Sequence, residues 1–303
     1  MSLLLATPLA RVRRVVRALT GDPTSPLAGR TVLVTGASSG VGEATARAVA
    51  ARGATVLLVA RRAAELDRVR DAVEAAGGTA YTFVVDLTDG PAVDALVRRV
   101  VAEFGPVDHL VNNAGRSIRR SLDLTYDRFH DFERTMAVNY FGPLRLTMGL
   151  LPAMRAQKFG HVVNVVTWGV QVKSPKFAAY IASKSALDVF GRIAGRETYR
   201  DNVTFTNLRL SLVRTDMVAP TEAYSRVPAL TPEQAALKVV RALEERPITV
   251  DVLPARLAEI ANVVAPRLTD LVFSLADRAF PDSVAARGTG DAERLRSRDG
   301  SLG

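Results

Sequence analysis

Short apolar stretches alternate with longer amphipathic ones along most of this 303-residue chain. The longer, amphipathic stretches have enough residues for helices of ten or more residues. A strand that is apolar throughout must be buried on both faces, and parallel strands need long, usually helical, connections. The alternation therefore predicts an α/β fold with a single doubly wound parallel sheet and helices on both faces. The strands are expected at 31–36, 55–61, 81–88, 109–115, 161–167 and 203–213.

A glycine-rich segment, "TGASSGVG" (35–42), joins the first predicted strand to the first predicted helix. Gly36 permits a tight turn, and Gly40 and Gly42 let the backbone and the helix N-terminus approach a diphosphate closely. Glycines between a strand and a helix indicate a dinucleotide site and make the predicted fold Rossmann-type. The residues expected to bind the cofactor here are Gly36, Ser38, Ser39, Gly40, Val41 and Gly42.

The second predicted strand ends in "VARR", with arginines at 61 and 62. Rossmann proteins that prefer NAD usually place an acidic residue here, which binds the ribose 2′-hydroxyl. Arg61 and Arg62 instead suit a 2′-phosphate, because a guanidinium can bind two phosphate oxygens at once. The sequence thus favours NADP(H) over NAD(H). The alternative is that both arginines are solvated residues at the start of a helix.

The segment "AAYIASK" (178–184) places a tyrosine and a lysine four positions apart. In a helix, Tyr180 and Lys184 lie one turn apart on the same face. A neighbouring ammonium stabilises tyrosinate and lowers the phenol pKa from its usual value of about 10. The phenol would then be a usable proton donor near neutral pH. The alternative is an amphipathic helix with an exposed lysine and a half-buried tyrosine.

The composition excludes several kinds of site. The chain has no cysteine, which excludes disulfides, thiolate zinc sites and an enzyme-bound thioester, and fits a cytoplasmic location. The three histidines are widely separated, so we expect no metal. The net charge of +9 favours an anionic partner such as a phosphorylated cofactor, coenzyme A or a membrane surface. Nucleic acid is not an expected partner, because no aromatic-interleaved basic patch or helix-turn-helix pattern is present.

We expect three regions along the chain. Residues 1–27 form a basic amphipathic segment, in which leucines and valines interleave with four arginines. Residues 1–20 could lie on an anionic membrane, or pack on the chain's own domain. Residues 28–280 form the Rossmann domain with a C-terminal helical extension, and the polar tail at 281–303 is expected to be disordered. No apolar run approaches the roughly 20 residues that span a bilayer.

Four motifs in this order carry a family resemblance: "TGASSGVG", "NNAG" (112–115), the asparagine of "AVNYFG", and "YIASK". Together they make residues 28–250 resemble the short-chain dehydrogenases/reductases. The resemblance implies that several further residues contact the cofactor, Asp86 and Leu87 near the adenine and Thr215 at the carboxamide. Besides the glycine segment and the two arginines, these are Asp86, Leu87, Asn113, Ala114, Gly115, Val213 and Thr215. Homo-oligomers are usual in this superfamily, so one is expected here.

The same resemblance assigns the catalytic residues. Tyr180 is the catalytic acid/base, Lys184 binds the nicotinamide ribose, and Asn139 holds a water of the proton relay. Thr167 stands where the family usually has a serine that binds the substrate carbonyl, and it keeps the hydroxyl but adds a methyl group. A second departure is Ser211-Leu212, which replaces the family's Pro-Gly over the nicotinamide. The adjacent Trp168 either walls the substrate pocket or fills core.

A narrower resemblance lies in the segments 112–142, 211–224 and 246–266. These are similar to bacterial long-chain fatty acyl-CoA reductases, which implies NADPH-dependent reduction of an acyl-CoA thioester to a fatty aldehyde. A cluster of three arginines is compatible with this resemblance, because arginines could bind the phosphates of coenzyme A: Arg116, Arg119 and Arg120. The alternative is that these arginines lie in a solvated loop. The helical apolar pattern at 257–280 could cover an acyl chain, or be core or an oligomer contact.

Two other functions remain open. The same residues could reduce a different carbonyl, such as a 3-oxoacyl group, a hydroxysteroid-type ketone or a fatty aldehyde. Alternatively, the chain could bind NADP(H) without catalysis, as a sensor or scaffold. Only Thr167 and the altered 211–212 loop support the second reading, because Asn139, Tyr180 and Lys184 are all present.

Overall fold

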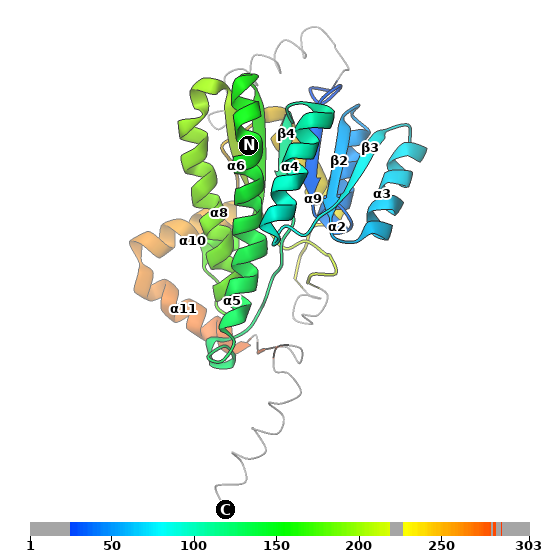
Figure 1. Ribbon diagram of the computed structural model, residues 1–303. Coiled ribbons are helices and arrows are strands. Elements are labelled where there is room, and N and C mark those ends of the chain that lie inside the picture. Colours follow the sequence, from blue (N-terminus) through cyan, green and yellow to red (C-terminus); the bar gives the residue numbers. More distant parts are fainter. Residues whose placement is uncertain (1–24, 219–226, 280, 283–285, 287–303) are drawn as a thin grey trace, which may run out of the picture.

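The computed structural model describes residues 25–218, 227–279, 281, 282 and 286 (Figure 1). The prediction of membrane contact through residues 1–20 lies outside these residues, as do nearly all of residues 1–27 and most of the predicted tail at 281–303. Within the described part of the chain, no helix is long and apolar enough to cross a membrane.

The centre of the molecule is a seven-stranded parallel sheet in the order β3-β2-β1-β4-β5-β6-β7. The Rossmann-type, doubly wound sheet is thereby confirmed. The strands are β1 (Thr31–Thr35), β2 (Thr55–Ala60), β3 (Thr79–Val84), β4 (His109–Asn112), β5 (Gly160–Thr167), β6 (Val203–Leu210) and β7 (Thr249–Val250).

Helices cover both faces of the sheet, as the apolar strands require (Figure 1). Along β1, Val32 and Val34 pack into the core on one face, and Leu33 packs into the core on the other. One face carries α2 (Gly40–Ala50), α3 (Ala63–Ala75) and α9 (Pro232–Glu245). The other carries α4 (Gly90–Phe104), α6 (Gly142–Ala156) and α8 (Ala178–Glu197).

The remaining helices lie around the carboxyl ends of the strands or on the periphery. They are the short η2 (Leu122–Leu124), α5 (Phe129–Met136), the π-helix η3 (Ala137–Phe141), α7 (Gly169–Val172), η4 (Tyr199–Asp201), α10 (Leu253–Val264) and α11 (Pro266–Ala279). The pair α10–α11 projects from one side of the domain (Figure 1). Its large apolar side chains are mostly exposed, so the reading of 257–280 as ordinary core is wrong.

Several strands end earlier than predicted, because local hydrogen bonds turn the chain. After β3, Asp86 accepts bonds from the backbone nitrogen and hydroxyl of Thr88, at 2.9 and 2.8 Å. After β6, the chain leaves the sheet, and Val213 pairs with Leu230 instead. The strand β7 was not predicted, because two residues carry no readable periodicity.

The strand order places a crevice beside β1. The chain builds β1, β2 and β3 in one direction, and β4 then pairs with the opposite side of β1. The loops that leave the carboxyl ends of β1 and β4 therefore run to opposite sides. In open α/β sheets, ligands bind at such a switch point. The glycine segment follows β1 and "NNAG" follows β4, so both flank this crevice.

Buried asparagines link the three strands on one side of the crevice. Asn112, Asn164 and Asn207 occupy paired positions on β4, β5 and β6. The amide of Asn112 donates to Asn164 at 3.0 Å, and that of Asn164 donates to Asn207 at 3.2 Å. The amide of Asn207 in turn donates to the carbonyl of Asp188 on α8, at 2.6 Å. This chain of bonds fixes α8, which carries Tyr180 and Lys184, against the sheet.

Candidate active site

A cavity of about 720 Å³ opens over the carboxyl ends of the strands. Every predicted cofactor or catalytic residue lines it except Gly42 and Asn139. The lining residues that the sequence predicted are Gly36, Ser38, Ser39, Gly40, Val41, Arg61, Arg62, Asp86, Leu87, Asn113, Ala114, Gly115, Thr167, Tyr180, Lys184, Val213 and Thr215. Among the described residues, no group of three or more His, Cys, Asp or Glu side chains could hold a metal.

The glycine segment has no room for side chains. A Cβ atom at Gly42 would lie 2.1 Å from the carbonyl oxygen of Gly36, and Gly36 itself has a φ of +66°. Gly42 therefore lets the helix pack onto the turn and does not itself face the cavity. Gly40 has a φ of +54°, and a Cβ there would lie 3.1 Å from the side chain of Thr215. This cradle, at the N-terminus of α2, fits a dinucleotide diphosphate.

Thr35 joins the two loops of the crevice, a role that the sequence did not predict. Its hydroxyl donates to the carbonyl of Val111 at 3.1 Å. The same oxygen accepts bonds from the backbone nitrogens of Asn113 and Ala114, both at 3.0 Å. The Asn113 amide returns a bond to the Thr35 carbonyl at 3.0 Å. The threonine that opens "TGASSGVG" thus holds "NNAG" in place beside the glycine turn.

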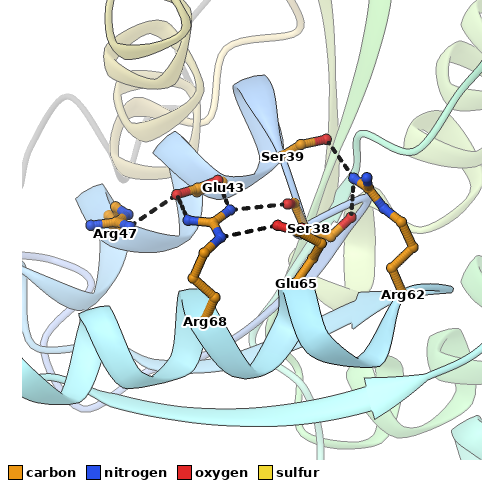
Figure 2. Close-up of polar contacts among 7 residues, drawn as sticks. All are labelled: Ser38, Ser39, Glu43, Arg47, Arg62, Glu65 and Arg68. Carbon is orange, nitrogen blue, oxygen red and sulfur yellow. Dashed lines mark hydrogen bonds and ion pairs between the residues drawn. The ribbon is translucent and has the colours of Figure 1, made fainter. Parts of the chain in front are cut away.

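The two arginines after β2 have different surroundings. The guanidinium of Arg62 lies 3.3 Å from the hydroxyls of both Ser38 and Ser39 (Figure 2). Within the described part of the chain, it has no carboxylate partner. The side chain of Arg61 is 74% exposed and lies 3.7 Å from Asp86. Arg62 is therefore the better placed of the two to receive a phosphate beside the serines.

Tyr180 and Lys184 both lie on α8 and face the cavity. The ammonium of Lys184 is buried and donates to the carbonyl oxygen of Val165 on β5, at 3.0 Å. Burial lowers the pKa of Lys184 to about 8. A Cβ atom at Gly115 would lie 3.1 Å from this ammonium, so a side chain there would crowd Lys184. The Tyr180 ring packs at a tilt on Phe177, with 6.3 Å between the ring centres.

Asn139 lies behind the cavity wall, in the π-helix η3. Its side-chain oxygen accepts from the backbone nitrogen of Arg116 at 2.8 Å, and its amide donates to the Arg116 carbonyl at 2.9 Å. The amide also donates to the hydroxyl of Ser183 at 2.9 Å. These bonds tie the segment after β4 to α8, one residue from Lys184. A π-helical turn of this kind often marks a functional site.

Thr167 is the last residue of β5, and its hydroxyl accepts a bond from the backbone nitrogen of Gly169 at 3.1 Å. An accepted bond leaves the hydroxyl hydrogen for another acceptor, such as a substrate carbonyl. Trp168 also lines the cavity, which supports the first of the two readings given for it. Ser211 and Leu212 line the cavity too, and the carbonyl oxygen of Leu212 accepts a hydrogen bond from the backbone nitrogen of Leu230 at 2.9 Å.

The three arginines after "NNAG" do not form one cluster. Arg116 lines the cavity, and burial lowers its pKa, with Arg134 contributing. Arg120 pairs with the buried Asp131, and its side chain is only 13% exposed. Arg119 donates to the backbone of Pro281 at 2.9 Å. Of these three arginines, only Arg116 lines this cavity, and their contact with coenzyme A phosphates stays a prediction, as does the alternative of a solvated loop.

Other residues of the cavity carry no motif and could not be identified from the sequence. They come from the segment between α7 and α8 and from the loop after β6: Ser174, Phe177, Arg214, Met217 and Val218. Only their position in the fold brings them to the site. The loop segment 219–226, which follows them, lies outside the described residues.

Two relatives, both named fatty acyl-CoA reductases, are similar to this chain over four fifths of its length or more. A fatty acyl-CoA reductase of Acinetobacter baylyi is 45% identical over 270 residues, covering 89% of this chain and 92% of its own. A fatty acyl-CoA reductase of Mycobacterium tuberculosis is 45% identical over 242 residues, covering 80% and 82% respectively.

The crystal structure of a 3-oxoacyl (acyl-carrier-protein) reductase from Agrobacterium tumefaciens, with NADP bound, is 30% identical with a TM-score of 0.64. It covers 71% of this chain and 87% of its own. The model of the short chain dehydrogenase family matches residues 30–225, which include the glycine segment, "NNAG", Asn139 and "YIASK". The chain therefore belongs to the short-chain dehydrogenase family and is an oxidoreductase with a nicotinamide cofactor.

Proposed function

We propose that the protein is an NADPH-dependent reductase of long-chain acyl-CoA thioesters, releasing a fatty aldehyde and free coenzyme A. The observation that carries the proposal is the 45% identity to the Acinetobacter fatty acyl-CoA reductase over 92% of that protein's length. The similarity is thus not confined to the cofactor-binding half, which is common to the whole family. It extends through the segments around the substrate side of the cavity.

The chain's own residues have the geometry for the chemistry. When bound, the nicotinamide supplies a hydride to the carbonyl carbon. The hydroxyls of Thr167 and Tyr180, two residues that line the cavity, bind the carbonyl oxygen, and Tyr180 donates a proton to it, which gives a thiohemiacetal. The thiohemiacetal then collapses: its C–S bond breaks, its hydroxyl proton passes to the departing sulfur, and the aldehyde and free coenzyme A result. Lys184 supplies a positive charge that favours tyrosinate formation. Asn139 holds α8 to the segment after β4, and thereby supports the proton relay.

The preference for NADPH rests on the surroundings of Arg62. A 2′-phosphate at this position would meet its guanidinium and the hydroxyls of Ser38 and Ser39, each of which already lies 3.3 Å from that guanidinium. The 30% identical 3-oxoacyl reductase has NADP bound, which is in keeping with this preference. The end of β2 carries no acidic residue that could bind a ribose 2′-hydroxyl, because the strand ends at Ala60 and is followed by two arginines.

The long acyl chain requires an apolar surface near the cavity. The pair α10–α11 exposes large apolar side chains, namely Leu253, Leu257, Ile260, Val263, Val264, Leu268, Leu271, Val272 and Leu275. The pair packs against the segment that walls the cavity: Asn262 donates to the backbone of Gln171 at 2.9 Å, and Asp277 pairs with Lys176 at 2.6 Å. We assign the acyl chain to this apolar face.

The test follows NADPH absorbance with palmitoyl-CoA and with a long-chain aldehyde in separate assays. Oxidation with palmitoyl-CoA, accompanied by one free thiol per NADPH, is expected. Tyr180→Phe should lose this activity by at least about 100-fold, since a positioned general acid contributes at least that much, while still binding NADPH. Oxidation with the aldehyde alone would instead favour a carbonyl reductase that uses the same residues.

The acyl-chain assignment has a separate test. Leu257→Gln together with Leu271→Gln should raise KM for palmitoyl-CoA and leave KM for butyryl-CoA unchanged, because only the long chain reaches the apolar face. Ser274→Gln, at an exposed position of α11, is the matched control and should change neither KM. Equal effects on both substrates would assign the apolar face to another role.

A further inference from the structure

An arginine outside the cavity lining connects the two elements that form the proposed 2′-phosphate pocket. Arg68 lies on α3, six residues after Arg62, which immediately precedes that helix. Its guanidinium donates to both carboxylate oxygens of Glu43 on α2, at 2.8 and 2.7 Å (Figure 2). It also bonds Glu65 at 3.0 Å, and it lies 3.4 Å from the carbonyl of Ser38.

The position of Glu43 makes this contact important for an anionic ligand. Glu43 lies in the first turn of α2, the helix whose N-terminus faces the proposed diphosphate and 2′-phosphate sites. A carboxylate there opposes the binding of phosphate through like-charge repulsion, and its side chain is only 19% exposed, which limits screening by solvent. The bond from Arg68 lowers the pKa of Glu43, against the effect of burial, so the carboxylate stays ionised.

Arg68 thus has two effects on one pocket. It neutralises the carboxylate of Glu43 with a bidentate, charge-assisted pair. It also bonds α3 to the first turn of α2, which helps to set the spacing between Ser38 and Arg62. Without Arg68, Glu43 would keep Arg47, at 2.9 Å, as its only ion-pair partner among the described residues.

We propose that Arg68 is a positioning residue that determines cofactor specificity: by pairing with Glu43 and holding α2 to α3, it lets Ser38, Ser39 and Arg62 accept the 2′-phosphate of NADP(H). The inference rests on the NADPH preference in the proposed function and goes beyond it, because Arg68 itself does not touch the cofactor. It predicts that the effect of Arg68 depends on the charge of Glu43.

The experiment measures the Kd of NADP⁺ and of NAD⁺ by titration calorimetry, so it does not depend on the identity of the carbonyl substrate. Arg68→Gln should weaken NADP⁺ binding by about tenfold, the scale of one charge-assisted contact, and NAD⁺ binding by less than about threefold. The double variant Glu43→Gln/Arg68→Gln should bind NADP⁺ more tightly than Arg68→Gln, because the repulsive charge is then absent, and about threefold more weakly than the wild type, because the bond between α2 and α3 is absent as well.

Arg70→Gln is the matched control, because it removes the same charge from the same helix. Arg70 pairs with Asp67 and Asp71 on α3 itself, so its removal should leave both Kd values unchanged. Equal weakening of NADP⁺ and NAD⁺ by Arg68→Gln, with no recovery in the double variant, would overturn the inference and make Arg68 a general structural residue. A wild type without preference for NADP⁺ would instead overturn the proposed cofactor, and with it the basis of the inference.

Discussion

The ammonium of Lys184 donates a hydrogen bond of 3.0 Å to the carbonyl oxygen of Val165, the residue two positions before Thr167 on β5. This bond connects the helix that carries Tyr180 to the strand that carries the other proposed oxygen-binding group. The ammonium is almost fully buried, and burial lowers its pKa to about 8. The positive charge that we propose supports Tyr180 is therefore lost at a lower pH than an exposed lysine would lose it.

The reductive kcat/KM for NADPH should accordingly be constant below pH 8 and fall above it. Lys184 holds its proton below a pKa of about 8 and loses it as the pH rises, while proton donation by Tyr180 also needs the protonated phenol. Lys184→Met should be weakly active at every pH and show no break near 8. A wild-type profile that stays flat up to pH 9.5 would contradict this account of Lys184.

Thr167 should act through its hydroxyl and not through its methyl group. Thr167→Val keeps the shape but removes the donor, and should lower kcat by about 100-fold, the scale of one lost oxyanion donor. Thr167→Ser keeps the donor and should retain wild-type kcat within a few fold. Steady-state kinetics with the preferred substrate decide the question. A fully active valine variant would mean that Tyr180 alone binds the carbonyl oxygen.

The two arginines after β2 should contribute unequally to NADPH binding. Arg62→Gln should raise KM for NADPH by about tenfold and leave KM for NADH nearly unchanged, because its guanidinium lies beside Ser38 and Ser39. Arg61→Gln should have a smaller effect, since that side chain is exposed and faces Asp86. If the two variants behaved alike, the distinction drawn from the structure between Arg61 and Arg62 would be wrong.

Stability should fall in mild acid because of two buried histidines. His109 and His161 face each other across β4 and β5, with 6.1 Å between ring centres. Burial lowers the pKa of His109 to about 3 and that of His161 well below its usual value. The unfolded chain binds these protons near pH 6.5, so stability is fully present above that pH and decreases as the pH falls toward 3.

Each such imidazole should contribute a slope of about 1.4 kcal/mol per pH unit to the free energy of unfolding in this window. Urea denaturation at pH 7 and pH 5 measures the difference. His109→Leu removes one of the two groups and should reduce the slope by about half. Identical slopes for His109→Leu and the wild type would refute this assignment.

The strands and the glycine turn could be predicted from the sequence because local rules decide them. The residues of β1 are mostly apolar in a continuous run, which predicts a buried strand whatever it packs against. Gly36 can adopt its φ of +66° in any fold, because glycine has no Cβ atom. The spacing of Tyr180 and Lys184 likewise fixes their common helical face. From the family motifs we further predicted that Asn113, Thr167 and Thr215 belong to one site, and in the structure all three line the same cavity.

Other features depended on which elements meet in space, and no local pattern records that. The sequence presents Arg116, Arg119 and Arg120 as equivalents, but only the fold places Asp131 beside Arg120 and leaves Arg116 at the cavity. The spacing of apolar residues in α10 and α11 predicts helices but does not say whether those residues are buried. Their exposure depends on which elements pack against the two helices, and only the tertiary structure shows that. Arg68 meets Glu43 for the same reason, since α2 and α3 become neighbours only when β1 and β2 pair.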